Sequence, residues 1–250
     1  MAIQGVIFDL GHTLMYLDST WPEVFEHGVA DLALFLDAQG LGLDGAAFAR
    51  TLLERRAEGF ALAGSTYREV TAEDSMRWVF SRFGLCDPKP RLVTGAIDAF
   101  FAYEQAHWRA YPEAQATLKE LSDRGLRLGV FSNATHDPFI QHLVDRLGFR
   151  PWLNPALSSA GTGIRKPDPA AFTPILEAWE LPSTSVAVVG DTLDADVLGA
   201  RQAGMRSIWI PSREDARQEG TRGTAVPDAT IQSLSELPAC LEQLQADTPE

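Results

Sequence analysis

The chain has 250 residues, of which 45% are hydrophobic and 22% are charged, as is usual for a globular protein with a buried core. Its 34 Asp and Glu residues outnumber 21 Lys and Arg residues, which gives a formal net charge of −13 and a pI near 4.8. So acidic a surface repels nucleic acids and anionic membranes, and an anionic substrate would need a bound cation or a placed Lys or Arg.

The first residues carry neither the basic start nor the apolar stretch of a secretory signal. No apolar run approaches the roughly 20 residues of a membrane span. The two cysteines, Cys86 and Cys240, lie far apart and form no zinc-binding spacing. These features predict a soluble cytoplasmic protein that neither crosses a membrane nor binds nucleic acid.

Short apolar runs that end in polar groups predict the strands of a buried sheet. They cover residues 6–8, 126–133, 186–191, 206–210 and, more weakly, 228–231. Because three of the runs are almost continuously apolar over a few residues, they suit parallel strands that are covered on both faces.

Stretches with helical hydrophobic spacing lie between these runs. They cover residues 113–125, 168–180 and 193–205. Asp168 is expected to cap the second stretch with Pro169 in its first turn, whereas Pro174 predicts a distortion or a later helix start. Alternating strands and helices predict an α/β fold with a doubly wound, Rossmann-like parallel sheet. The polar stretch 211–228 predicts a surface loop.

Residues 18 to about 108 interrupt this alternation because they contain no clear strand. Four helical patterns fill the stretch, at residues 22–39, 46–62, 73–84 and 90–108. The simplest account is an all-helical domain, residues 18–108, inserted after the first strand of an α/β core. That core would comprise residues 1–17 and 109–250.

Side chains able to do chemistry follow the predicted strands at the points where the strands end. They are Asp9 after the first strand, Ser132 and Asn133 at the second, Asp191, Asp194 and Asp196 after the third, and Arg165 and Lys166 in a loop before Asp168. Ligands of open α/β sheets bind outside the carboxyl ends of the strands. We therefore expect acids, a hydroxyl and a cation to meet in one crevice.

Four ordered motifs built on these residues resemble those of the haloacid dehalogenase-like hydrolases. They read FDLGHTL (8–14), VFSN (130–133), GIRKPDPAAF (163–172) and VVGDTLDADVLGARQAGM (188–205). The resemblance covers the whole predicted core. The helical insert lies where subfamily I members of that family carry a helical cap.

The resemblance implies a phosphatase that acts on a small phosphorylated metabolite. Asp9 would attack the phosphoryl group and form an aspartyl-phosphate, which water then hydrolyses. Lys166 would bridge the nucleophile and the phosphate, and Ser132 would donate a hydrogen bond to a phosphoryl oxygen. Substrate contacts are expected from Asn133, beside that serine, and from His12.

The resemblance also implies a Mg²⁺ cofactor, because hard oxygen ligands suit that ion. Asp9 and Asp191 would supply carboxylates, Asp196 would act directly or through water, and Gly11 would offer its main-chain carbonyl. The family's phosphatases usually carry a second aspartate at the position of Gly11, where it serves as general acid and base. Losing such a group typically costs on the order of 10²–10⁴ in rate.

Gly11 leaves three alternatives open. His12, Asp18 or a residue of the insert replaces the missing acid, or the leaving group is good enough to need none, as in an acyl phosphate or a sugar 1-phosphate. Alternatively, the reaction is not phosphoryl transfer. Dehalogenases of the family typically carry an aromatic residue there, and phosphonate-cleaving members use a cap lysine, whereas the insert contains only Lys89.

We therefore expect a phosphatase with a replaced or dispensable acid, present as a monomer or homodimer. Two alternatives are kept beside it. One is a 2-haloacid dehalogenase, and the other is a catalytically impaired member that acts as a binding protein.

Overall fold

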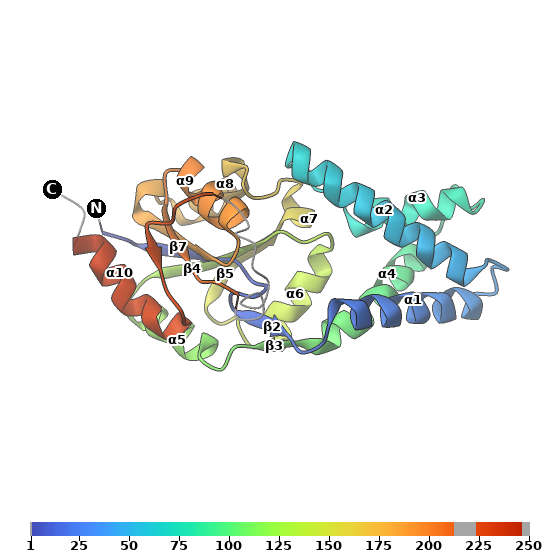
Figure 1. Cartoon of the computed structure of the whole chain (residues 1–250), viewed down its shortest axis with the longest axis horizontal. Helices are drawn as coiled ribbons and strands as arrows, with labels where there is room; N and C mark the ends of the chain where they lie inside the picture. The colour runs from blue at the N-terminus through green and yellow to red at the C-terminus, as the bar shows by residue number, and fades with distance from the viewer. Residues whose placement is uncertain (1, 213–223, 247–250) are drawn as a thin grey trace. The chain divides into compact units, whose positions relative to one another are not determined.

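The computed structural model describes residues 2–212 and 224–246 of the chain, and it divides the chain into two compact units. The α/β unit comprises Met1–Tyr16 and Arg109–Glu250, and the helical unit comprises Leu17–Trp108. Two short strands, β2 (Met15–Leu17) and β3 (Trp108–Ala110), pair where the chain passes between the units (Figure 1). Most of the predicted loop 211–228 lies outside the described residues.

Among the described residues, the α/β unit contains a six-stranded sheet in the order β5-β4-β1-β6-β7-β8, and every strand pair is parallel. The strands are β1 (Gly5–Phe8), β4 (Arg127–Ser132), β5 (Leu153–Ser158), β6 (Val186–Gly190), β7 (Arg206–Trp209) and β8 (Ala229–Thr230). Strands β1 and β6 are buried along their whole length. This arrangement confirms the predicted α/β fold with a parallel sheet.

The central strand β1 pairs with β4 on one side and with β6 on the other, so that Ile7 stands opposite both Gly129 and Val188. From β1 the chain winds outward to β5 in one direction and then to β8 in the other. The strand order therefore reverses beside β1. In open α/β sheets, ligands bind at such a switch point, outside the carboxyl ends of the strands.

Helical segments cover both faces of this sheet. They are α5 (Ala114–Asp123), α6 (Asp137–Arg146), α7 (Ser159–Thr162), η1 (Pro169–Phe172), α8 (Thr173–Trp179), η2 (Ser183–Ser185), η3 (Leu193–Val197), α9 (Leu198–Gln202), η5 (Leu234–Glu236) and α10 (Leu237–Ala246). Figure 1 shows α8 and α9 on one face of the sheet and α5 and α10 on the other. Ile7, Phe131, Phe172 and Trp179 share one buried cluster on the α8 side.

One predicted helix has the later start that Pro174 indicates, and another begins with an unpredicted π-helical turn. Residues 168–180 form a 3₁₀ turn, η1, followed by α8, and Pro174 lies in the first turn of α8. A proline is tolerated there because the first turn makes no use of its missing N–H. Residues 193–205 begin as a π-helix, η3, before α9 continues. The edge strand β5 was not predicted.

The helical unit, all of whose residues are described, contains α1 (Trp21–Ala38), α2 (Gly45–Thr66), α3 (Ala72–Arg82) and α4 (Pro90–His107). These helices lie where the hydrophobic spacing predicts them. Thr20, Asp44 and Thr71 cap the first three helices by accepting hydrogen bonds from main-chain N–H groups. None of the described helices is both long enough and apolar enough to span a membrane.

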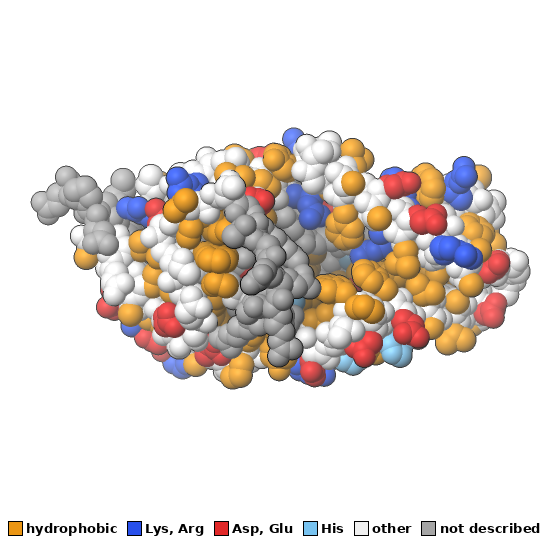
Figure 2. Space-filling model, in the orientation of Figure 1, with side chains coloured by type: hydrophobic (Ala, Val, Ile, Leu, Met, Phe, Trp, Pro, Cys, Tyr) orange, Lys and Arg blue, Asp and Glu red, His pale blue; other side chains and the backbone are white. Residues whose placement is uncertain are grey.

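Exposed hydrophobic side chains concentrate in the helical unit. Among the described residues they include Trp21, Phe25, Leu34, Phe60, Leu62, Tyr67 and Trp78. Figure 2 shows hydrophobic side chains gathered over that unit, with acidic and basic side chains scattered singly among them.

Candidate active site

Strand β1 places Asp9 at the carboxyl edge of the sheet. The main-chain N–H of Asp9 donates to the carbonyl of Val189 at 2.8 Å, so the pairing with β6 continues one residue past the strand. The residue is 8% exposed. The chain then turns sharply, with the N–H of Leu14 donating to the carbonyl of Leu10, and His12 takes the left-handed conformation at φ 58°. A buried carboxylate thus stands at the start of a tight loop.

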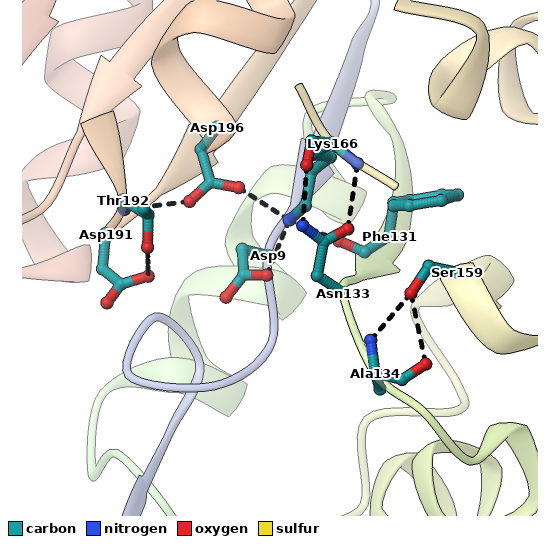
Figure 3. Close-up of polar contacts among 9 residues, drawn as sticks. All are labelled: Asp9, Phe131, Asn133, Ala134, Ser159, Lys166, Asp191, Thr192 and Asp196. Carbon is teal, nitrogen blue, oxygen red and sulfur yellow. Dashed lines mark hydrogen bonds and ion pairs between the residues drawn. The ribbon is translucent and has the colours of Figure 1, made fainter. Parts of the chain in front are cut away.

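Lys166 lies directly against this carboxylate. Its ammonium donates three hydrogen bonds, to Asp9 Oδ1 at 2.7 Å, to Asp196 Oδ1 at 2.6 Å and to the carbonyl of Phe131 at 2.8 Å (Figure 3). The residue is 4% exposed. Burial alone would lower the pKa of Lys166, but Asp196 and Asp9 together raise it above its ordinary value. Lys166 is therefore charged at neutral pH.

Asn133 holds the main chain of Lys166. The amide of Asn133 accepts from the Lys166 N–H and donates to the Lys166 carbonyl, each at 2.9 Å (Figure 3). One residue further on, the main chain of Ala134 exchanges hydrogen bonds with the hydroxyl of Ser159. The amide that was predicted to contact substrate is thus occupied by the lysine loop.

Asp196 connects this lysine to the loop after β6. Its Oδ1 accepts from Lys166, and its Oδ2 accepts from the Thr192 N–H at 2.9 Å. The π-helical turn brings it back over the end of β6, where a Cβ on Gly190 would lie 2.2 Å from its Cγ. Only a glycine at position 190 therefore leaves room for this carboxylate.

Asp191 follows Gly190 and is held on both its side chain and its main chain. The Thr192 hydroxyl donates to Asp191 Oδ1 at 3.2 Å, and the indole N–H of Trp209 donates to the Asp191 carbonyl at 2.8 Å. Sequence reasoning missed Thr192, Trp209 and the amide role of Asn133. The glycine directly before Asp191 indicates close packing from the sequence alone. Nothing in the sequence indicates that the indole of Trp209 contacts the Asp191 carbonyl.

Asp9, Asp191 and Asp196 each offer an oxygen, and these oxygens lie within 4.8 Å of one another. Burial, and then the charges of Asp9 and Asp196, raise the pKa of Asp191 to about 8. Burial also raises the pKa of Asp196 to about 6, despite the adjacent Lys166. When ionised, three carboxylates and one ammonium sum to −2.

The cluster fits a divalent cation with oxygen ligands. Such an ion would balance its charge of −2, and hard cations prefer carboxylate oxygens. Asp9 Oδ2 and Asp191 Oδ2 accept no hydrogen bond from the described residues, so both are available as ligands. Asp196 has both oxygens occupied by Lys166 and Thr192, which favours contact through water.

Of the other predicted site residues, Gly11 and His12 follow Asp9 in the chain, and Ser132 follows Phe131, whose carbonyl accepts from Lys166. Ser132 ends β4 and is 7% exposed, and its hydroxyl makes no hydrogen bond within the described part of the chain. Gly11 forms an isolated bridge with Met15 in the loop after Asp9. Gly11 and His12 are half-buried in that loop.

Comparisons with known proteins agree with these motifs. The family model of the haloacid dehalogenase-like hydrolases matches residues 3–204. The chain is 28% identical to the glyceraldehyde 3-phosphate phosphatase of Methanocaldococcus jannaschii, over 98% of this chain and 100% of that one. It is also 28% identical to the ribulose-1,5-bisphosphate 5-phosphatase of Halopiger xanaduensis, over 93% and 97%.

A solved structure points to a second chemistry. The 2-haloacid dehalogenase from Pseudomonas syringae pv. tomato matches with a TM-score of 0.72 and 28% identity, covering 97% of this chain and 99% of that one. Similarity at this level therefore extends to both phosphatases and a dehalogenase. The choice between them depends on the site.

Proposed function

The chain belongs to the haloacid dehalogenase-like hydrolase family and is a hydrolase, and from this premise we propose that it is a Mg²⁺-dependent phosphatase acting on a small phosphorylated metabolite. The observation that carries the proposal is the set formed by buried Asp9, Lys166 and Asp196 with half-buried Asp191, whose charge and oxygens suit a divalent cation. Relatives named as phosphatases over nearly the whole chain support it. The helical unit would be the cap that selects the substrate.

In this proposal Asp9 and Asp191 bind Mg²⁺ directly, Gly11 contributes its main-chain carbonyl, and Asp196 acts through water. The bound ion would supply positive charge beside the phosphoryl group and would keep Asp9 ionised. Among metal ions, Mg²⁺ usually keeps several waters and takes few carboxylates. The two free oxygens found here match that preference.

Asp9 is the nucleophile in this proposal, because Lys166 holds its Oδ1 while its Oδ2, which accepts no hydrogen bond from the described residues, is left for the cation. Attack of Oδ1 on phosphorus forms an oxygen–phosphorus bond and breaks the bond to the leaving oxygen, which departs with the electron pair and takes up a proton. Water then attacks the phosphorus of the aspartyl-phosphate, releasing inorganic phosphate and the Asp9 carboxylate. Ser132, whose hydroxyl makes no hydrogen bond with the residues that the structure describes, would donate to a phosphoryl oxygen.

Gly11 cannot supply the proton for the leaving oxygen. Either another group supplies it, for which His12 is the candidate that directly follows Gly11, or the substrate has a leaving group that needs none. The two readings differ in one measurement. If His12 is the acid, His12→Ala slows hydrolysis of alkyl phosphates about 10²-fold or more but leaves acyl phosphates nearly unchanged. If the acid is dispensable, wild type hydrolyses acyl phosphates well and alkyl phosphates poorly.

The proposal is tested with a panel of phosphomonoesters in the presence of Mg²⁺. We expect phosphate release that stops on chelation, and loss of activity and of trapped phosphate on Asp9→Asn. Absence of turnover, together with absence of phosphate bound to Asp9, would remove the proposal.

The dehalogenase reading is kept because of the match to the Pseudomonas syringae structure. It requires halide release from short 2-haloacids that a chelator does not affect. A binding protein would instead hold Mg²⁺ and phosphate without turnover, and Asp9→Asn would leave that binding unchanged.

A further inference from the structure

The last residue of β7, Trp209, lies beside the end of β6. In the sheet Trp209 stands opposite Gly190, and the N–H of Ile210 donates to the Gly190 carbonyl at 3.0 Å. The indole N–H of Trp209 then donates to the carbonyl of Asp191 at 2.8 Å. The hydrogen bond from the Trp209 side chain thus continues the β6–β7 pairing one residue further, to the carbonyl of Asp191.

This contact fixes a peptide that would otherwise be weakly held. Asp191 comes after the last residue of β6, and within the described part of the chain its side chain accepts one hydrogen bond, from the Thr192 hydroxyl at 3.2 Å. The direction of its carboxylate therefore depends on the orientation of its main chain. A half-buried ring anchored in β7 supplies that orientation at little entropic cost, because a tryptophan has two rotatable side-chain bonds.

We propose that Trp209 is a positioning residue for the divalent-cation site, acting through the main chain of Asp191 to set the affinity for Mg²⁺. The inference rests on the proposed function, since it assumes that Asp191 binds Mg²⁺. Groups that orient metal ligands from behind typically change metal affinity or activity by about 10–100-fold when they are removed.

A second tryptophan provides a matched control. Trp179 is 4% exposed, and its indole N–H donates to the carbonyl of Asn154, also at 2.8 Å. Neither Trp179 nor Asn154 bonds to the acid cluster. Trp179→Phe therefore removes an indole–carbonyl hydrogen bond of the same length from the same unit without touching the site.

Trp209→Phe and Trp209→His distinguish the contribution of the indole N–H from that of the ring's volume. In histidine, Nε2 is joined to Cβ through the same number of bonds as the indole nitrogen, so its N–H can reach the same carbonyl. Phenylalanine keeps more of the aromatic surface but has no N–H. If affinity depends on the hydrogen bond, the histidine variant binds Mg²⁺ better than the phenylalanine variant although it fills the site less well.

The experiment titrates Mg²⁺ alone into the full chain by calorimetry, after circular dichroism melts have shown that each variant is folded. We expect Kd to rise about 10-fold or more for Trp209→Phe, to be largely restored in Trp209→His, and to stay within about twofold of wild type for Trp179→Phe. Trp209→Tyr, which also lacks an N–H at that position, replaces the phenylalanine variant if the latter does not fold.

Each other outcome has a distinct meaning. Wild type that binds no Mg²⁺ overturns the proposed function and this inference together. Wild type that binds Mg²⁺, with the same Kd in the Trp209 variants, overturns the inference alone. An equal loss in Trp179→Phe and Trp209→Phe also overturns it, because a general loosening of the core would then explain both.

Discussion

Lys166 uses all three ammonium hydrogens on protein acceptors, two of them carboxylate oxygens. Its first role is therefore to compensate the negative charge of Asp9 and Asp196, which are both buried. If it also contacts the phosphoryl group, it must exchange one of these acceptors for a substrate oxygen. Breaking a buried ion pair by removing one partner is costly, because the remaining charge has lost its compensation.

We expect Lys166→Met to lower the free energy of unfolding by about 3–5 kcal/mol without Mg²⁺. The double variant Lys166→Met/Asp196→Asn should regain part of that loss, because it leaves one buried carboxylate fewer. Urea denaturation of wild type, the single variant, the double variant and one control variant measures both effects. Lys119→Met is the control, since its pair with Asp123 is about two-thirds exposed and such pairs contribute little. A cost for Lys166→Met as small as that of the control would contradict the charge-balancing role.

At the scale of elements, the end of β6 and the π-helical turn η3 act as one packing unit. The turn places Asp196 over Gly190 with no space for a side chain between them. Short π-helical turns inside α-helices are frequent at functional sites. Here the turn allows one carboxylate to reach both Lys166 and the N–H of Thr192.

Gly190→Ala should therefore displace Asp196 and weaken both Mg²⁺ binding and turnover, beyond its effect on stability. The control is Gly129→Ala in β4, where the added Cβ would lie 2.8 Å from Trp179 Cζ2, away from the acids. Calorimetric Mg²⁺ titration and thermal melts of both variants separate the effects. Loss of stability without loss of Mg²⁺ affinity in Gly190→Ala would show that Asp196 does not need its present position.

The helical unit offers a separate element-scale prediction. Thr71 caps α3 in a reciprocal arrangement, in which its hydroxyl accepts from the Asp74 N–H at 3.0 Å and the Asp74 carboxylate accepts from the Thr71 N–H at 3.2 Å. Thr71→Ala should lower the free energy of unfolding by about 1 kcal/mol. Thr71→Ser should retain most of that stabilisation, because a serine hydroxyl can form the same cap. Equal denaturation midpoints for the two variants would rule out a contribution from the cap.

The elements differ in how far the sequence could predict them. Strands β1 and β6 are continuous apolar runs, and β4 and β7 each hold buried apolar residues after a leading arginine. The sequence predicts all four because burial on both faces leaves a local signal. The edge strand β5 contains Asn154 and Pro155 next to each other and is only partly buried, so its sequence is typical of a loop. The helix at 193–205 has the right period, but its π-helical start depends on packing against Gly190.

The candidate site shows the same division. Asp9, Lys166, Asp191 and Asp196 could be predicted to meet because each follows a strand or lies in a recognisable motif. The bond from Lys166 to Asp9 nonetheless joins residues 157 apart, and the amide of Asn133 reaches a main chain 33 residues away. Such partners depend on three-dimensional register. This is why Asn133 and Trp209 gave no signal for the contacts they make.

For the molecule as a whole, the acid cluster couples stability to pH. The pKa values of Asp191, about 8, and Asp196, about 6, lie above the ordinary aspartate value, chiefly because of burial. Between about pH 4 and about pH 8 the folded protein without metal therefore binds more protons than the unfolded chain. Since the unfolded state binds fewer protons, the free energy of unfolding falls as the pH rises through this window.

Mg²⁺ should reverse this trend, because it binds the ionised carboxylates and competes with their protons. We expect the metal-free protein to lose thermal stability from about pH 5 to about pH 8 more steeply than Asp191→Asn, which has no carboxyl to deprotonate there. Mg²⁺ should raise the Tm of wild type more at pH 8 than at pH 6. At one hundred times its Kd, the ion adds about 2.7 kcal/mol to the free energy of unfolding. Mg²⁺ should leave the Tm of Asp191→Asn almost unchanged.

If wild type and Asp191→Asn show parallel pH profiles without metal, Asp191 does not hold a proton in the folded protein. A wild-type Tm that ignores Mg²⁺ at both pH values would mean that the cluster is not a cation site.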